Sequence, residues 1–136
     1  MRVVFDTNVL VSGIFTQGGV CHRILELVRD GALIPCADGR IHQEYETVFR
    51  YPKLSPIAEP AREILSFIRG TAVRVGAIPL RTELPDESDL PFLEVASAAS
   101  AVLITGNTRH FPARACGSVT VMTPAALLDH LRKPPG

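Results

Sequence analysis

The sequence predicts an α/β fold in which helices cover both faces of a mostly parallel sheet of about five strands, a three-layer α/β/α sandwich. Short apolar runs alternate with segments of helical periodicity, which is typical of right-handed βαβ units. The first apolar run ends at Asp6-Thr7-Asn8, as expected for a buried parallel strand that carries a carboxylate to its C-terminal edge. Open α/β sheets keep their sites at that edge, so Asp6 is the first candidate for function.

The expected strands are short apolar runs bounded by turn residues: 2–6, 33–36, 73–75, 101–105 and 119–122. The expected helices place apolar residues on one face: a segment around 24–28, then 41–50, 61–70, 92–101 and 125–131. Gly18-Gly19 leads into the first helix and Asp30-Gly31 ends it. Tyr51-Pro52-Lys53 ends the second, because proline disfavours a helical conformation in the residue before it.

Capping residues define the later helices. Ser88 is a good N-cap for the helix at 92–101, with Asp89 in its first turn and Pro91 tolerated there. Thr123 is an N-cap followed by Pro124 at the first helical position. The run at 101–105 is apolar throughout, which favours a central strand.

The length of 136 residues is within the range of a single domain, and we expect one domain over residues 1–131 with a flexible tail at 132–136. Hydrophobic residues at 46% and charged residues at 21% indicate a globular chain. The 14 basic and 14 acidic residues give a formal net charge of +0, so no global basic field attracts nucleic acid. Such a partner must be held by a local patch.

The three cysteines, Cys21, Cys36 and Cys116, are far apart and form no Cys-x-x-Cys pair, so we expect buried, reduced thiols. The N-terminal apolar stretch contains Asp6 and Asn8, which argues against a secretory signal. No run approaches the roughly 18 apolar residues of a membrane span. We therefore expect a cytoplasmic protein that binds no membrane.

Further polar groups lie where other elements of the sheet are expected to begin or end: Glu44, Asp86, Asp89 and Asn107. If they converge with Asp6, they form a set of oxygen ligands of the kind that Mg²⁺ prefers. Close carboxylates raise one another's pKa, and a cation supplies the missing charge. A bound cation would acidify a water for attack on a phosphodiester.

Each of these residues also has a purely structural interpretation. Asp6 alone is as compatible with capping as with function, and Asn8 is more typical of a capping or turn residue than of a ligand. A lone helical glutamate such as Glu44 is usually solvated. Asp86 and Asp89 lie where acids stabilise a helix N-terminus by roughly 0.3–1 kcal/mol each.

The ordered set of these motifs resembles the PIN domain family. The resemblance rests on Asp6-Thr7-Asn8, Glu44-Tyr45 with Arg50-Tyr51-Pro52-Lys53 behind it, Asp86 and Asp89 before residues 92–96, and Thr105-Gly106-Asn107. It extends from Met1 to about Leu131, and the closest match is the branch described as toxins of toxin–antitoxin pairs. No single motif is decisive, but the order and spacing of the set are specific.

The resemblance implies a metal-dependent endoribonuclease with Mg²⁺ or Mn²⁺ held by Asp6, Glu44 and Asp89, which are its catalytic residues. Position 107 takes the family's fourth acid, but this chain has Asn107, a neutral oxygen ligand without charge. Asp86 is a further acid beside this set. The resemblance also implies an antitoxin partner and a homodimer, and the latter is compatible with apolar positions on the helices between Ile41 and Ile68.

Single-stranded RNA requires cations and aromatic side chains near the acids. The candidates are Asn8, Thr105, Arg40, Arg50, Lys53, Arg109 and His110, with Tyr51 available for stacking. Taken one by one, most of these charges are equally compatible with a solvated surface.

Other classes remain open. Phosphatases of the haloacid dehalogenase type also begin with a strand and an aspartate, but they need a second aspartate two residues later, where this chain has Asn8. A receiver domain would need an acidic pair at the first strand and a lysine at a late strand, which this chain lacks. A catalytically weak PIN-like module that binds RNA or protein is the alternative, because Asn107 replaces an acid.

Overall fold

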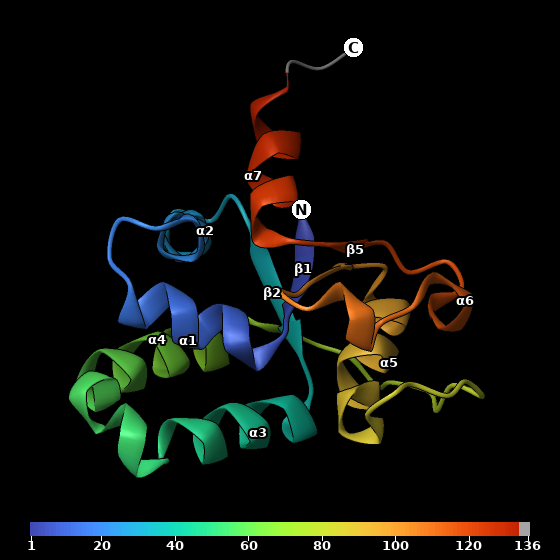
Figure 1. Cartoon of the computed structure of the whole chain (residues 1–136), viewed down its shortest axis with the longest axis horizontal. Helices are drawn as coiled ribbons and strands as arrows, with labels where there is room; N and C mark the ends of the chain where they lie inside the picture. Colours follow the sequence, from blue (N-terminus) through green and yellow to red (C-terminus); the bar gives the residue numbers. More distant parts are fainter. Residues whose placement is uncertain (134–136) are drawn as a thin grey trace.

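The computed structural model describes residues 1–133 and forms a five-stranded sheet between two layers of helices (Figure 1). The strands are β1 (Arg2–Phe5), β2 (Ile34–Ala37), β3 (Val73–Arg74), β4 (Val102–Ile104) and β5 (Val121–Met122). Their order in the sheet is β3-β2-β1-β4-β5, and every neighbouring pair is parallel. The expected α/β/α sandwich is thus confirmed.

The helices are α1 (Thr7–Phe15), α2 (Val20–Arg29), α3 (Gly39–Phe49), α4 (Ala58–Thr71), α5 (Leu90–Ala99), α6 (Ala113–Cys116) and α7 (Pro124–Arg132). Short 3-10 turns precede or follow them: η1 (Pro52–Ile57), η2 (Glu87–Asp89) and η3 (Thr108–His110). Figure 1 shows α1 to α4 on one side of the sheet and α5 and α6 on the other. Helix α7 returns to pack against α2.

The strand order places a topological switch point at β1. The chain builds outward from β1 through β2 to β3 on one side, then crosses to β4 and β5 on the other. The segments that follow β1 and β4 therefore lie beside each other at the carboxyl edge of the sheet. In doubly wound folds this crevice is the usual ligand site, and here Asp6 follows β1 while Thr105 follows β4.

The core follows from the apolar patterns that predicted the elements. Val3, Val4 and Phe5 of β1 are at most 1% exposed, as expected for a strand with helices on both faces. Thr123 caps α7, since its side chain accepts a hydrogen bond from the backbone N–H of Ala126. Asp38 caps α3 in the same way through the N–H of Ile41.

The main element missing from the sequence prediction is α1. Its helix begins at Thr7, directly after Asp6, in a stretch for which the sequence predicts no helix or strand. The segment contains Val9, Val11 and Ile14, and β-branched residues lower helix propensity. Tertiary packing of α1 against α2 supplies the stability that local propensity does not.

Several boundaries also differ. The first strand ends at Phe5, the third at Arg74 and the fourth at Ile104, while the fifth begins at Val121. The helix expected at 61–70 spans Ala58–Thr71, because Pro60 falls in its first turn, where proline is tolerated. Helix α7 continues to Arg132, the first residue of the predicted tail, and residues 134–136 of that tail lie outside the described part of the chain.

The expected cap at Ser88 is wrong, because Ser88 lies within η2 and its N–H donates to the side chain of Asp86. The apolar surface expected between Ile41 and Ile68 is also largely absent, since both of these residues are buried. Within residues 41–68, all of which the structure describes, Tyr51 is the exposed large hydrophobic side chain. These helices direct their apolar faces inward.

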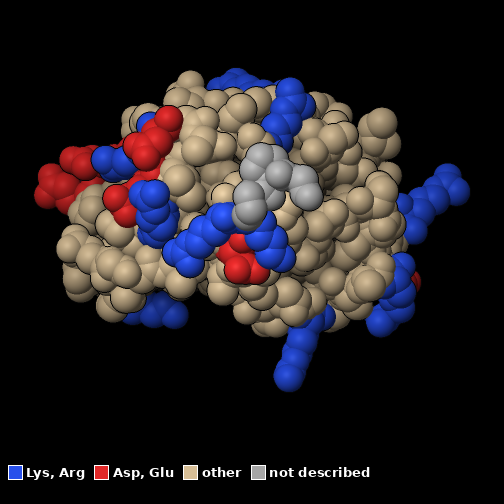
Figure 2. Space-filling view, turned by 90° about the horizontal axis from the view of Figure 1, so that it is seen from above, with Lys and Arg blue, Asp and Glu red and all other residues tan. Residues whose placement is uncertain are grey.

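Figure 2 shows the molecule from above, where acidic side chains gather at one side and basic ones are spread over the rest. No continuous basic field covers this face, in keeping with the net charge of +0. Across residues 1–133, the helices are too short or too polar for any of them to traverse a bilayer.

Close packing of α1 on α2 depends on Gly13. A Cβ atom at Gly13 would lie 2.7 Å from Leu25 Cδ1 and 2.9 Å from the carbonyl oxygen of Cys21. The leucine side chain can move, but the backbone carbonyl cannot without displacing α2.

We therefore predict that Gly13→Ala lowers the free energy of unfolding by roughly 1–3 kcal/mol, the usual range for overpacking. Urea denaturation checks it. The matched control is Gly39→Ala at the first position of α3, where a Cβ would meet nothing within 4 Å. Equal stability of the two variants would contradict the packing account.

Candidate functional site

Asp6 lies at the carboxyl end of β1 and is only 6% exposed. It occupies the N-cap position of α1, but its side chain makes no capping hydrogen bond. Instead its Oδ2 accepts a hydrogen bond of 2.7 Å from the hydroxyl of Thr105, which is completely buried. The backbone N–H of Asp6 donates to the carbonyl of Ile104. The capping interpretation therefore fails, and the carboxylate is oriented by the loop after β4.

That loop, Thr105-Gly106-Asn107, folds around the same hydroxyl. The backbone N–H of Asn107 donates to Thr105 Oγ1 at 3.0 Å, so the hydroxyl joins the loop to Asp6. Asn107 itself is exposed, with its amide side chain free of a capping bond to the following turn. A Cβ at Gly106 would meet no atom within 4 Å, which leaves open space beside the backbone. The loop offers an oxygen ligand and an approach path.

Glu44 reaches the site from α3. Its Oε2 accepts a hydrogen bond of 2.5 Å from the hydroxyl of Thr7, the residue next to Asp6. The adjacent Tyr45 is buried, and its hydroxyl donates to the carbonyl of Phe5 at 2.6 Å. Burial raises the pKa of Tyr45 well above its ordinary value, and the charges of Asp6 and Glu44 add to this effect. Two hydrogen bonds thus join α3 to the end of β1.

The structure separates the roles of Asp86 and Asp89. Exposed Asp86 is the cap of η2, and its Oδ1 accepts hydrogen bonds from the N–H and the hydroxyl of Ser88. Both hydrogen bonds lower the pKa of Asp86, and the one from the Ser88 hydroxyl has the larger effect. Asp89 occupies the N-cap position of α5 without a side-chain capping bond and is only 9% exposed. The capping interpretation holds for Asp86 and fails for Asp89.

The surroundings of Asp89 disfavour the ionised form of its carboxyl group, a condition that we call electrostatic frustration. Burial raises its pKa from the ordinary 3.8 to about 6, and the charges of Asp6 and then Asp86 contribute to the rise. His110 Nδ1 lies 3.0 Å from Asp89 Oδ2 and opposes the shift. The contact is not aligned as a hydrogen bond, because this oxygen has no hydrogen-bond partner within the described residues. A carboxyl group whose pKa is raised by burial and by the charge of a second carboxylate favours the arrival of a cation.

A divalent metal fits this donor set in part. No group of three or more His, Cys, Asp or Glu side chains in residues 1–133 is arranged to hold an ion. Two buried carboxylates that influence each other electrostatically are present, however, and Mg²⁺ is commonly bound by one or two carboxylates with waters and substrate phosphate. Asp6 and Asp89 are the residues that fit such an ion.

The other residues predicted to contact RNA differ in their exposure and in their ion-pair partners. Asn8 lies in the first turn of α1 and is exposed, as are Arg50 at the end of α3, Lys53 in η1 and Arg109 in η3. Arg40 is held by Asp38 at 2.7 Å and by buried Glu94 at 2.8 Å. Its guanidinium is thereby committed to a structural role, so its assignment to RNA is not supported.

The sequence did not predict the hydrogen bonds by which Tyr45 and Glu94 connect elements around the site. The carboxylate of Glu94 also accepts the backbone N–H of Leu80, which fixes the irregular segment before η2. A glutamate among the small, apolar residues of α5 was the available signal. A buried charge in such a position requires partners.

Comparison with known proteins shows the family of the chain. Residues 2–109 match the family model described as PIN domain. The sequence is 27% identical over 110 residues to an uncharacterised protein of Methanocaldococcus jannaschii, an alignment that covers 79% of this chain and 71% of that protein.

Solved structures share the fold at low sequence identity. VapBC2 of Rickettsia felis, bound to a DNA fragment from its promoter, has a TM-score of 0.62 and 17% identity over 90% of this chain and 98% of that one. FitAcB of Neisseria gonorrhoeae gives a TM-score of 0.62 and 16% identity with the same coverage. A domain of a functionally unknown protein from M. jannaschii gives 0.55 and 17%, over 90% of this chain and 89% of that one.

The raised pKa of Asp89 yields a prediction on stability. Near pH 4 to 6 the folded state holds a proton on Asp89 that the unfolded chain releases, so this group makes stability fall as pH rises through that window. In metal-free protein above about pH 7, Asp89→Asn should therefore raise the free energy of unfolding by roughly 1–3 kcal/mol.

Urea denaturation in EDTA at several pH values checks this, with the difference between wild type and variant isolating Asp89 from other titrating groups. Asp129→Asn on α7 is the matched control, because the Asp129 side chain is 73% exposed, so no stabilisation is expected. A difference between wild type and Asp89→Asn that does not vary with pH would exclude the predicted frustration.

Proposed function

The chain belongs to the PIN domain family, and from that premise we propose that it is a metal-dependent endoribonuclease that hydrolyses RNA phosphodiester bonds. The observation that carries the proposal is the pair of buried carboxylates, Asp6 and Asp89, at the switch point of the sheet. A structural role would leave such a pair with capping bonds, and neither side chain makes one. The pair suits a divalent cation instead.

In this proposal Asp6 and Asp89 hold Mg²⁺ or Mn²⁺, and the amide oxygen of Asn107 assists them. When bound, the cation supplies positive charge to the scissile phosphate and acidifies the attacking water. Thr105 keeps the Asp6 carboxylate in one orientation through its hydroxyl.

Glu44 and the surrounding cations have separate roles. Glu44, fixed by Thr7, orients the attacking water on the α3 side of the site. His110 contacts Asp89 at 3.0 Å and holds the side chain beside the entrance of the site. Arg109 lies in the same turn, η3, and is exposed to contact substrate phosphate.

We further propose that the chain is the toxin of a toxin–antitoxin pair. Support comes from the sequence resemblance to that branch of the family and from the fold shared with VapBC2 and FitAcB. The partner would be an antitoxin protein, and cytoplasmic RNA would be the substrate.

Cleavage of labelled single-stranded RNA with Mg²⁺, with Mn²⁺ or with EDTA tests the proposal. We predict metal-dependent cleavage that falls by roughly 100-fold or more in Asp6→Asn and in Asp89→Asn, since each change removes a charge that the transition state requires. Asp129→Asn on α7, whose side chain is 73% exposed, is the matched control and should cleave like wild type.

Metal binding gives a readout independent of turnover. Mn²⁺ should raise the melting temperature of wild type and of Asp129→Asn, but not that of Asp89→Asn, because only a folded site with both acids binds the ion. Equal cleavage by wild type and Asp6→Asn, or an equal Mn²⁺ shift in all variants, would refute the acid pair as the metal site.

Asn107 gives the next prediction. Asn107→Asp adds a charged oxygen beside Asp6 and Asp89, so we expect Mn²⁺ affinity to rise by roughly tenfold, the effect of one favourable charge contact. Calorimetric titration checks it, with Gln17→Glu, which adds the same charge at an exposed position between α1 and α2, as the control. A folded wild type that binds RNA without cutting it, together with an Asn107→Asp variant that cuts, would favour the binding module over the nuclease.

A further inference from the structure

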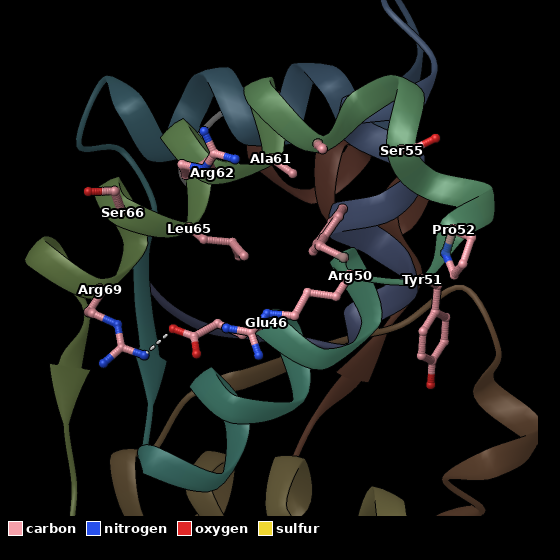
Figure 3. A pocket seen from close by; sticks show the side chains of 12 residues that line it. Glu46, Arg50, Tyr51, Pro52, Ser55, Ala61, Arg62, Leu65, Ser66 and Arg69 are labelled. Carbon is pink, nitrogen blue, oxygen red and sulfur yellow. Dashed lines mark hydrogen bonds and ion pairs between the residues drawn. The ribbon is translucent and has the colours of Figure 1, made fainter.

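A groove separates α3 from α4 on the side of the molecule away from Glu44 (Figure 3). It has a volume of about 530 Å³, and we call it the α3–α4 groove. It is lined by Glu46, Phe49, Arg50, Tyr51, Pro52, Ser55, Ala58, Ala61, Arg62, Leu65, Ser66 and Arg69. Figure 3 shows Leu65 pointing into the cavity, with charged side chains along its borders.

The charge of the α3–α4 groove is strongly one-sided. Arg50, Arg62 and Arg69 line it, against one carboxylate, Glu46, which pairs with Arg69 at 2.5 Å. In the part of the chain that the structure describes, neither Arg50 nor Arg62 has a carboxylate within ion-pair distance. Two guanidinium groups are therefore available to an incoming anion.

A second cavity, between α1, α2 and the first turns of α4, has the opposite balance. Glu26 and Asp30 line it against a single arginine, Arg29. The chain as a whole has a net charge of +0, so the positive charge of the α3–α4 groove is a local feature. A polyanion is therefore favoured at the α3–α4 groove over the second cavity.

We propose that the α3–α4 groove binds a single-stranded stretch of RNA. This inference rests on the proposed ribonuclease function, which requires an RNA strand to extend beyond the catalytic acids. Arginine suits phosphate because its planar fork donates two hydrogen bonds at once. The apolar floor of Phe49, Ala61 and Leu65 accommodates bases, which are less polar than the backbone that carries them.

Helix α3 connects the groove with the acids. Glu44 faces Thr7 and the acid site, while Glu46 faces Arg69 and the groove, so the two sites lie on different sides of one helix. The C-terminal end of α3 borders the groove. Arg50 and Tyr51 lie at that end, and Tyr51 is 45% exposed with its ring turned outward (Figure 3). An exposed aromatic ring between cations is a stacking surface for an unpaired base.

The spacing along α4 suits an extended strand. Arg62 and Arg69 are separated by two helical turns, about 10 Å of helix. The cations thus follow the length of the groove instead of gathering at one point, as contacts to successive phosphates require.

Equilibrium binding of a fluorescein-labelled, unstructured 20-nucleotide RNA tests the proposal in EDTA, where the RNA stays intact. The double variant Arg50→Gln with Arg62→Gln should bind it roughly tenfold more weakly at moderate salt, and the slope of log K against log salt should decrease by about 1.4, the value for two phosphate contacts in single-stranded nucleic acid. Arg23→Gln with Arg132→Gln is the matched control, with the same charge change on α2 and α7, and should bind like wild type.

The possible outcomes distinguish failure of the groove proposal from failure of the ribonuclease proposal. If wild type binds and cleaves RNA, and both double variants match it in affinity and salt slope, the groove does not bind RNA. The ribonuclease proposal would still hold in that case. No RNA binding by folded wild type at low salt would remove the ribonuclease proposal itself. Competition by a 20-residue polyglutamate as effective as that by unlabelled RNA would also overturn the proposal, because the groove would then recognise negative charge of a protein partner. Melting temperatures identify any variant that fails to fold.

Discussion

The mutual repulsion of two buried carboxylates is the constraint on which the arrangement of this protein depends. Asp6 and Asp89 come from opposite halves of the chain, and each is withdrawn from solvent without a capping bond. Their proximity raises the pKa of Asp89 to about 6, after burial as the larger cause. If stability were the only requirement on the sequence, these two carboxylates would be far apart or would accept capping hydrogen bonds. Asp86 does accept such bonds, from Ser88. Local frustration that the rest of the structure maintains is typical of functional sites.

Maintaining that frustration requires rigid supports, and buried hydroxyl groups supply them. Thr105 connects the loop after β4 to Asp6, Thr7 connects α1 to Glu44, and Tyr45 connects α3 to the carbonyl of Phe5. Each bond joins two elements that leave the carboxyl edge of the sheet. Hydrogen bonds in such a dry setting are stronger than in water, and a missing partner is correspondingly costly. The acids are therefore positioned by the same contacts that close the layers of the fold.

Much of this was predictable, and the exceptions have physical reasons. Alternating apolar runs gave the strands and most helices, because periodicity is a property of the sequence alone. Helix α1 was missed since its β-branched residues are poor helix formers and its stability comes from packing on α2. The sequence puts Asp86 and Asp89 near the start of the same helix, and only burial and hydrogen bonding in the folded chain distinguish them. Arg40 illustrates the same limit, because its partner Glu94 lies 54 positions away in sequence.

The neutral net charge has a consequence for how such a protein meets RNA. With no global field, long-range steering is weak, so recognition depends on local sorting of charge between neighbouring surfaces. Helix α4 performs this sorting, since it borders an arginine-lined groove on one side and an acid-lined cavity on the other. Under the proposed function, this contrast in charge would favour RNA in the α3–α4 groove over the neighbouring cavity. Such a protein would direct a polyanion through the difference in charge between two adjacent surfaces and not through its total charge. The rest of its surface would then stay compatible with a protein partner.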